Sequence, residues 1–203
     1  MNGDKTMRCC LHALGTALHL ERSYSTTSVG LQINRWLTDK NVKKFASVFP
    51  NLQRLDLSHC FDISEKGITQ ILRSCCEIRD LNLAYIPKMR LSRMNFEVPK
   101  LEVLNLSHTR VDDIALYAIS KSCCGLLELL LENCEMITDE GVKHVLENCT
   151  QLKVINLRNC DKVLADVASM ILSRPSLIKI IPPTPVALNS ETIELCICSS
   201  VCA

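Results

Sequence analysis

Two hydrophobic patterns alternate along this chain, and the segment LLELLLENCEMITDEGVKHVLENC, residues 126–149, contains both. In its first part, Leu129 and Leu131 flank a single residue, which predicts a short strand with one buried face. The period then becomes helical, with Val142 on the apolar stripe and Thr138 as the predicted N-cap, a position that Ser64 takes in the similar segment ISEKGITQILRSC. The segment therefore predicts one strand followed by one amphipathic helix.

The same arrangement recurs at nearly constant intervals. Its first apolar positions are residues 52, 78, 101, 126 and 152, which are separated by steps of 26, 23, 25 and 26 residues. The units read Leu52, Leu55, Leu57, Cys60; Ile78, Leu81, Leu83, Ile86; Leu101, Leu104, Leu106, Thr109; Leu126, Leu129, Leu131, Cys134; and Leu152, Ile155, Leu157, Cys160. A degenerate unit fits Leu177 and Ile180, and an upstream one fits Leu31, Ile33 and Trp36. Five clear units at this period indicate leucine-rich repeats.

One strand and one helix cannot bury their own apolar faces, whereas stacked neighbours can. The sequence therefore predicts an α/β leucine-rich-repeat solenoid, a horseshoe arc with a parallel inner sheet and outer helices. Residues 28–181 form the predicted repeat domain, residues 1–27 an N-terminal helix and cap, and residues 182–203 a C-terminal tail or cap. The unit containing YIPKMRLSRMNFEVP lacks a helical period, so we expect an irregular outer segment there.

The pattern Leu-x-x-Leu-x-Leu-x-x-Cys, then Ile-Thr-Asp-x-Gly-Val, then a terminal Cys resembles the cysteine-containing leucine-rich repeats of F-box proteins. Those proteins are substrate receptors of Skp–cullin–F-box (SCF) ubiquitin ligases. The resemblance implies a substrate-recognition module in such a ligase. Residues 1–30 do not resemble an F-box, so we expect binding to the Skp adaptor only if an F-box lies upstream of this chain.

Composition narrows the possible functions. The formal net charge is +1, which argues against general attraction to nucleic acid or anionic membranes. No apolar run has the length of a transmembrane helix, and the N-terminal sequence does not fit a signal peptide. We therefore expect a cytoplasmic or nuclear protein in which the thirteen cysteines are reduced and the repeat cysteines act as small buried hydrophobes. In each of the doublets Cys75–Cys76 and Cys123–Cys124 we expect one buried repeat cysteine beside one more exposed cysteine.

The search for chemistry yields no catalytic motif, metal site or cofactor site. Glycine-rich phosphate loops are absent from the sequence, and the histidines are scattered. His59 and His108 occupy equivalent repeat positions, where we expect solvated or turn-stabilising side chains. The tail cysteines Cys196, Cys198 and Cys202 leave metal capture or lipidation open, beside a loosely ordered apolar end. We expect a protein that is not an enzyme.

Function is expected on the concave face, because the strand residues between the leucines point to it. The candidate partner-binding residues are Arg54, Asp56, Ser58, Asp80, Asn82, Val103, Asn105, Ser107, Glu128, Leu130, Glu132, Val154, Asn156 and Arg158. Leu130 is the apolar exception in the middle column of this mildly acidic face. We expect a protein or peptide ligand with some basic character. The alternatives are a leucine-rich-repeat scaffold or regulator without a ubiquitin role, and a small-molecule sensor.

Overall fold

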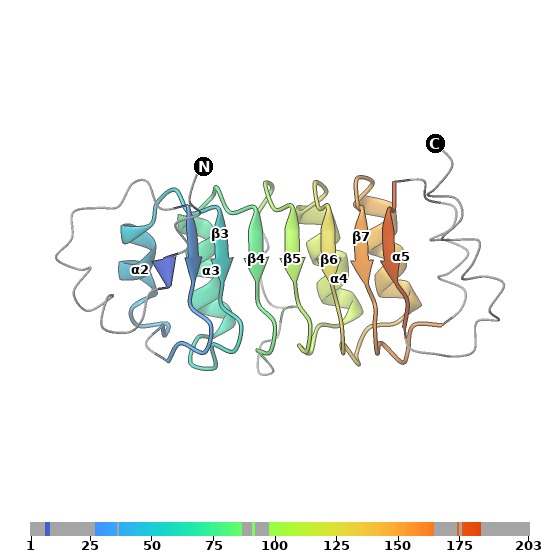
Figure 1. The fold of residues 1–203 in the computed structure, drawn as a ribbon, viewed down its shortest axis with the longest axis horizontal. Coiled ribbons are helices and arrows are strands. Elements are labelled where there is room, and N and C mark those ends of the chain that lie inside the picture. Colours follow the sequence, from blue (N-terminus) through green and yellow to red (C-terminus); the bar gives the residue numbers. More distant parts are fainter. Residues whose placement is uncertain are drawn as a thin grey trace.

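The structure is a computed structural model that describes residues 7–8, 27–35, 37–86, 91, 98–164, 174 and 176–183. Within these residues, eight parallel strands follow one another in chain order in a single open sheet (Figure 1). The strands are β1 (Met7–Arg8), β2 (Ser28–Gly30), β3 (Arg54–Asp56), β4 (Asp80–Asn82), β5 (Val103–Asn105), β6 (Glu128–Leu130), β7 (Val154–Asn156) and β8 (Lys179–Ile181).

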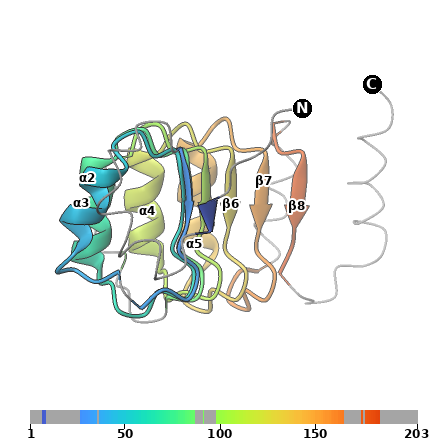
Figure 2. The same ribbon diagram turned by 60° about the vertical axis from the view of Figure 1, so that its left-hand side comes forward.

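All the helices described lie on one side of this sheet, as Figure 2 shows. They are α2 (Val42–Val48), α3 (Glu65–Ser74), α4 (Asp113–Ser122) and α5 (Asp139–Asn148). The predicted N-caps are confirmed for α3 and α5, where the hydroxyls of Ser64 and Thr138 accept hydrogen bonds from first-turn backbone N–H groups. The predicted α/β leucine-rich-repeat solenoid is thus confirmed, with the helices outside and the other sheet face uncovered.

The core lies between the sheet and the helices, and the repeat register builds it. Leu55, Leu81, Leu104, Leu129 and Ile155 pair in register across β3 to β7, and each is at most 2% exposed. The degenerate last unit joins the same row, because Ile155 pairs with Ile180 in β8. The repeat frame predicted from the leucine spacing is therefore correct from residue 52 to residue 181.

The upstream unit differs from its prediction by two residues. Val29, rather than Leu31, pairs with Leu55, so the buried positions of this unit are Val29 and Leu31. The predicted core residue Ile33 instead occupies a turn with φ 59° and is 69% exposed. The frame was misplaced because Leu31, Ile33 and Trp36 also show an apolar alternation; Trp36 itself lies outside the described residues.

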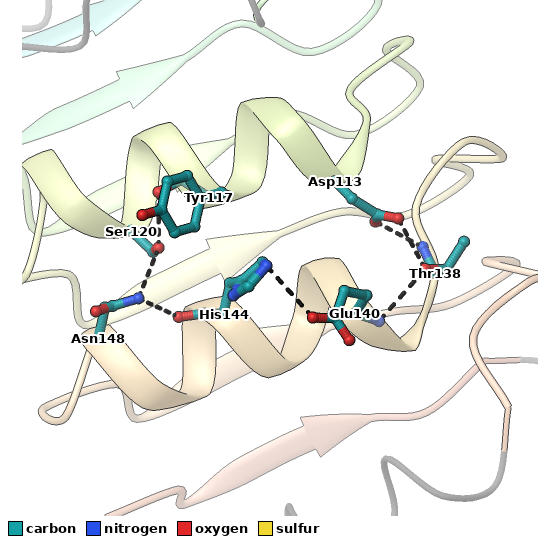
Figure 3. A network of polar contacts seen from close by, with 7 residues as sticks. All are labelled: Asp113, Tyr117, Ser120, Thr138, Glu140, His144 and Asn148. Carbon is teal, nitrogen blue, oxygen red and sulfur yellow. Dashed lines mark hydrogen bonds and ion pairs between the residues drawn. The ribbon is translucent and has the colours of Figure 1, made fainter.

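Side-chain hydrogen bonds connect neighbouring repeats at both ends of their helices, as Figure 3 shows for α4 and α5, and we call such a connection a clasp. At one end, the Asp113 carboxylate accepts hydrogen bonds from the Thr138 backbone N–H (2.8 Å) and hydroxyl (2.7 Å). At the other, the Asn148 side-chain amide donates to the Ser120 hydroxyl (3.2 Å). The Asp113 clasp has a counterpart at the start of α3, where Asp39 accepts from the backbone N–H and hydroxyl of Ser64.

Two sequence expectations fall largely outside the described residues. Of the predicted irregular outer segment YIPKMRLSRMNFEVP, the structure describes residues 85, 86, 91, 98 and 99, of which Ile86, Leu91 and Val98 are buried in the core. Of the predicted N-terminal helix and cap, it describes β1, which adds a strand beside β2. The predicted tail, residues 182–203, is described only at residues 182 and 183.

Candidate functional site

The uncovered face of the sheet carries the predicted binding residues in two rows set by the strand register. The first row contains Arg54, Asp80, Val103, Glu128 and Val154. The second row contains Asp56, Asn82, Asn105, Leu130 and Asn156. Ser58, Ser107, Glu132 and Arg158 follow two residues after the strands, in the turns. The fold thus brings the predicted residues of β3 to β7 to one face of the sheet, but Ser58, Ser107 and Asn156 are buried there and offer a partner little surface.

The second row has a structural task that the sequence did not reveal. The side-chain oxygens of Asp56, Asn82, Asn105 and Asn156 each accept a hydrogen bond of 2.8–3.0 Å from the backbone N–H two residues later. Each of these residues therefore forms an Asx turn that ends its strand. This task explains the Asp and Asn side chains without a ligand.

Leu130 stands in the same row and has no side-chain oxygen, so it cannot form that turn bond. Its side chain is half-buried, and Val103 and Val154, which flank Glu128 in the first row, are half-buried as well. The register adds Ile181 beside Asn156, which makes it a further half-exposed apolar member of the second row. We missed Ile181 because its unit is degenerate, although it lies 25 residues after Asn156. The apolar side chains of this face thus lie on β5 to β8.

The acidic strand residues of this face, Asp56, Asp80 and Glu128, lie on β3, β4 and β6, whereas its cations Arg54 and Lys179 lie on β3 and β8. Burial raises the pKa of the Asp80 carboxyl, nearby Arg54 opposes this rise, and Asp56 and Glu128 add to it. Asp56 is itself engaged by the Gln32 side-chain amide at 2.7 Å and by its turn. Asp80 therefore sits half-buried among like charges, which indicates an acidic surface suited to a cationic group.

The repeat cysteines are buried hydrogen-bond donors. The thiols of Cys60, Cys134 and Cys160 donate to backbone carbonyl oxygens of the preceding repeat at 3.0–3.2 Å. Burial raises the pKa of Cys60 and Cys160 to about 11 and that of Cys134 to about 12. These thiols are therefore protonated and unreactive at neutral pH.

The cysteine doublets were predicted to pair one buried thiol with one more exposed thiol. Cys75 and Cys123 are buried and Cys76 and Cys124 are exposed, which confirms this prediction. In the part of the chain that the structure describes, no group of three or more His, Cys, Asp or Glu side chains could hold a metal ion. The tail cysteines, from Cys196 onward, lie outside the described residues.

None of the helices in the described ranges has the length and apolar character needed to cross a membrane.

The fold and the repeat pattern define a leucine-rich-repeat protein. A family described as "Leucine Rich repeat" matches residues 99–120, which include β5 and most of α4. The cysteine-containing repeats resemble those of F-box/leucine-rich-repeat proteins, and the printed name of one relative contains this term.

The curated proteins that are similar to this chain include the following two. One is "Antagonist of mitotic exit network protein 1" from Eremothecium gossypii, which is 27% identical over 145 residues, 68% of this chain and 37% of that protein. The other is "Putative F-box/LRR-repeat protein 23" from Arabidopsis thaliana, 31% identical over 123 residues, 56% of this chain and 27% of that protein. The chain thus spans well under half the length of either relative.

Proposed function

We propose that this chain is a non-catalytic recognition module that binds a protein or peptide segment on the uncovered sheet face. The observation that carries the proposal is Leu130, which replaces the turn-forming Asp or Asn of its row. A leucine there gives up a backbone hydrogen bond and places apolar surface in water. Both costs have a functional explanation if a partner covers the side chain.

The proposed partner segment carries a basic residue next to an apolar one. Asp80 and Glu128 lie on either side of Val103 in the first row. A lysine or arginine reaching that position would lie near both carboxylates, and its apolar neighbour would cover Leu130. Charge complementarity would set the orientation and the association rate, and the apolar contact would provide most of the affinity.

We further propose that the partner is a substrate of an SCF-type ubiquitin ligase. The repeat type and the printed name of the Arabidopsis relative, which contains "F-box", support this context. The alternative is a regulator without a ubiquitin role, and the printed name of the Eremothecium relative, an antagonist of the mitotic exit network, favours it. Either role would place the chain in the cytoplasm or nucleus, where the repeat thiols stay reduced.

Quantitative affinity purification of the full chain tests the recognition face. We expect Leu130→Asp and Glu128→Lys each to deplete the same set of co-purifying proteins at least tenfold. Lys143→Glu, which changes an exposed residue of α5 on the opposite side of the molecule, is the matched control and should leave that set unchanged. Partners that survive both sheet-face variants would show that recognition occurs elsewhere.

A second experiment separates the two cellular contexts. The protein is expressed from its intact transcript and purified by affinity, and the co-purifying Skp and cullin subunits are then measured. Recovery of both subunits supports the ligase role. Their absence, with partners still lost on Leu130→Asp, supports the regulator.

A further inference from the structure

A second surface lies in the turns that follow the strands, at the edge of the sheet toward which the arrows of Figure 1 point. Six residues occupy equivalent positions there, and we call them the turn row: Ile33, His59, Tyr85, His108, Asn133 and Asn159. All six have φ between 55° and 60°, the left-handed region that favours glycine and asparagine. The backbone N–H groups of the first five donate to carbonyls of the next repeat, so the sheet register continues into these turns.

Side chains of the turn row stack on one another. The Tyr85 ring lies nearly parallel to the rings of His59 and His108, with centroids 4.2 and 4.0 Å away. The His108 ring then hydrogen-bonds to the Asn133 amide (3.1 Å), and Phe61 meets His59 edge to face at 6.1 Å. The rings are thus held in place before any partner arrives, which lowers the entropy cost of binding.

The choice of residues in the turn row changes along the chain. Later repeats use Asn133 and Asn159, and asparagine tolerates this conformation well. Earlier repeats use Ile33 and Tyr85, although bulky and β-branched side chains are strained there. Stacking offsets part of the strain at Tyr85, but Ile33 is 69% exposed. The turn alone therefore does not explain the residues of the early repeats.

The exposed parts of this surface are apolar and positively biased. The side chains of Ile33, Phe61 and Tyr85 are 69%, 50% and 40% exposed, and all three are among the exposed large hydrophobic residues of the described part of the chain. Because the faces of the Tyr85 ring are covered by imidazoles, it presents its electropositive edge to solvent. The flanking side chains Arg35 and Arg110 are exposed at the two ends of the early turns, and the exposed carboxylate Asp62 directly follows Phe61.

The equivalent flanking positions of the later repeats carry the opposite charge. Arg35 and Arg110 each directly follow the buried residue that ends the repeat motif, and Glu135 and Asp161 do the same in the later repeats. This edge of the sheet is therefore basic and aromatic in the early repeats and acidic and amide-rich in the later ones.

We propose that the early part of the turn row, from Ile33 to His108 with Phe61, binds an acidic peptide segment that carries an aromatic or aliphatic residue between its carboxylates. The apolar residue covers Ile33, Phe61 and the Tyr85 edge, and the carboxylates reach Arg35 and Arg110. Three strand spacings of about 4.8 Å separate the repeats of Ile33 and His108, so the site is about 14 Å long and fits four or five extended residues. This site is independent of the uncovered sheet face, which favours a basic segment.

Single-stranded nucleic acid is the competing occupant, because basic and aromatic side chains also bind it. Bases bind by stacking on free ring faces, and here the Tyr85 ring has both faces covered. An acidic peptide needs no free ring face, because its carboxylates would pair with the arginines and its apolar side chain would contact the ring edges. The arrangement therefore favours the acidic peptide.

A display library of random heptapeptides, panned against the immobilised full chain, tests the proposal. We expect enriched peptides with acidic residues on both sides of an aromatic or aliphatic one. Their fluorescein-labelled forms should bind at least tenfold more weakly to Tyr85→Asn and to the Arg35→Glu, Arg110→Glu double variant. Tyr85→Asn introduces the residue that later repeats already hold in this turn, so its melting temperature should not fall. Leu130→Asp is the matched control and should bind these peptides like the unaltered chain.

Three outcomes would overturn the proposal: no enriched sequence, enriched peptides without acidic residues, or unchanged affinity for Tyr85→Asn. Tighter binding of a ten-nucleotide oligouridine than of any selected peptide, lost on the same variants, would assign the surface to nucleic acid instead. Loss of peptide binding on Leu130→Asp would place the site on the sheet face. The proposed sheet-face function and this site can therefore fail separately.

Discussion

Replacement of Gly141 by alanine tests the clasp between repeats. A Cβ atom added at Gly141 would lie 2.2 Å from the Asp113 Oδ1 atom and 3.0 Å from its Cγ atom. The carboxylate would have to move, and it is held there by the backbone N–H and hydroxyl of Thr138. Gly141 is thus present because the Asp113 side chain crosses directly over it.

The size of the effect follows from two opposing terms. Losing the two hydrogen bonds to a half-buried carboxylate costs about 2–4 kcal/mol. Alanine is better than glycine inside a helix by about 1 kcal/mol. The expected net loss is about 1–3 kcal/mol, which for a chain of this size lowers the melting temperature by about 2–4 °C per kcal/mol.

A double-mutant cycle with Asp113→Ala makes the test sharp. Without the Asp113 carboxylate the clasp is already lost, so Gly141→Ala should become neutral or stabilising by up to about 1 kcal/mol. Urea unfolding of the four proteins, followed by circular dichroism, measures each term. The reasoning is refuted if Gly141→Ala destabilises the chain equally with and without Asp113.

Three further predictions use the same structure. Gly67→Ala should lower the melting temperature more than Gly141→Ala, because its added Cβ would lie 2.3 Å from the Asp39 Oδ1 atom and 2.7 Å from the Cγ1 atom of buried Ile63. Thermal melts should therefore show only partial rescue by Asp39→Ala. The pKa of Asp80 is raised in the folded chain, so between its ordinary and its raised pKa the folded state binds more protons than the unfolded state. The free energy of unfolding therefore falls as the pH rises from the ordinary to the raised pKa of this carboxyl. Asp80→Asn should therefore stabilise the chain at pH 7, with the gain disappearing below the ordinary carboxyl range; a pH series of urea midpoints that shows no such trend contradicts it. Iodoacetamide at neutral pH should label Cys76 and Cys124 but not the buried thiols of the described repeats, whereas labelling in urea should reach both groups, as peptide mass spectrometry can resolve.

The sequence was sufficient for the elements that repeat locally. Strand register and the N-caps Ser64 and Thr138 follow from spacing within one unit, and the structure places them as predicted. The frame of the first unit failed because Val29 and Leu31 compete with a second apolar alternation two residues later. Local patterns therefore predicted the fold well wherever a single frame fitted.

The roles that depend on a neighbouring repeat could not be predicted in this way. The partner of the Asp113 carboxylate, Thr138, lies 25 residues away, and the Cys134 thiol donates to a carbonyl 28 residues earlier. Such contacts exist only once the units are stacked. For the same reason the alignment of His59 and His108 on either side of Tyr85 became visible only in the structure, although the equivalence of the two histidines was evident from the sequence.

Departures from the repeat separate functional positions from structural ones on both surfaces. In the second row of the sheet, Asp and Asn have a structural reason in the Asx turn, and Leu130 has none. In the turn row, Asn133 and Asn159 suit the left-handed backbone, and Ile33 and Tyr85 do not. Each departure exposes apolar surface and gives up local stability, and selection retains such costs where a residue has another task. Replacing Leu130 or Tyr85 with the asparagine of its own row should therefore preserve or raise stability while abolishing binding at its own surface.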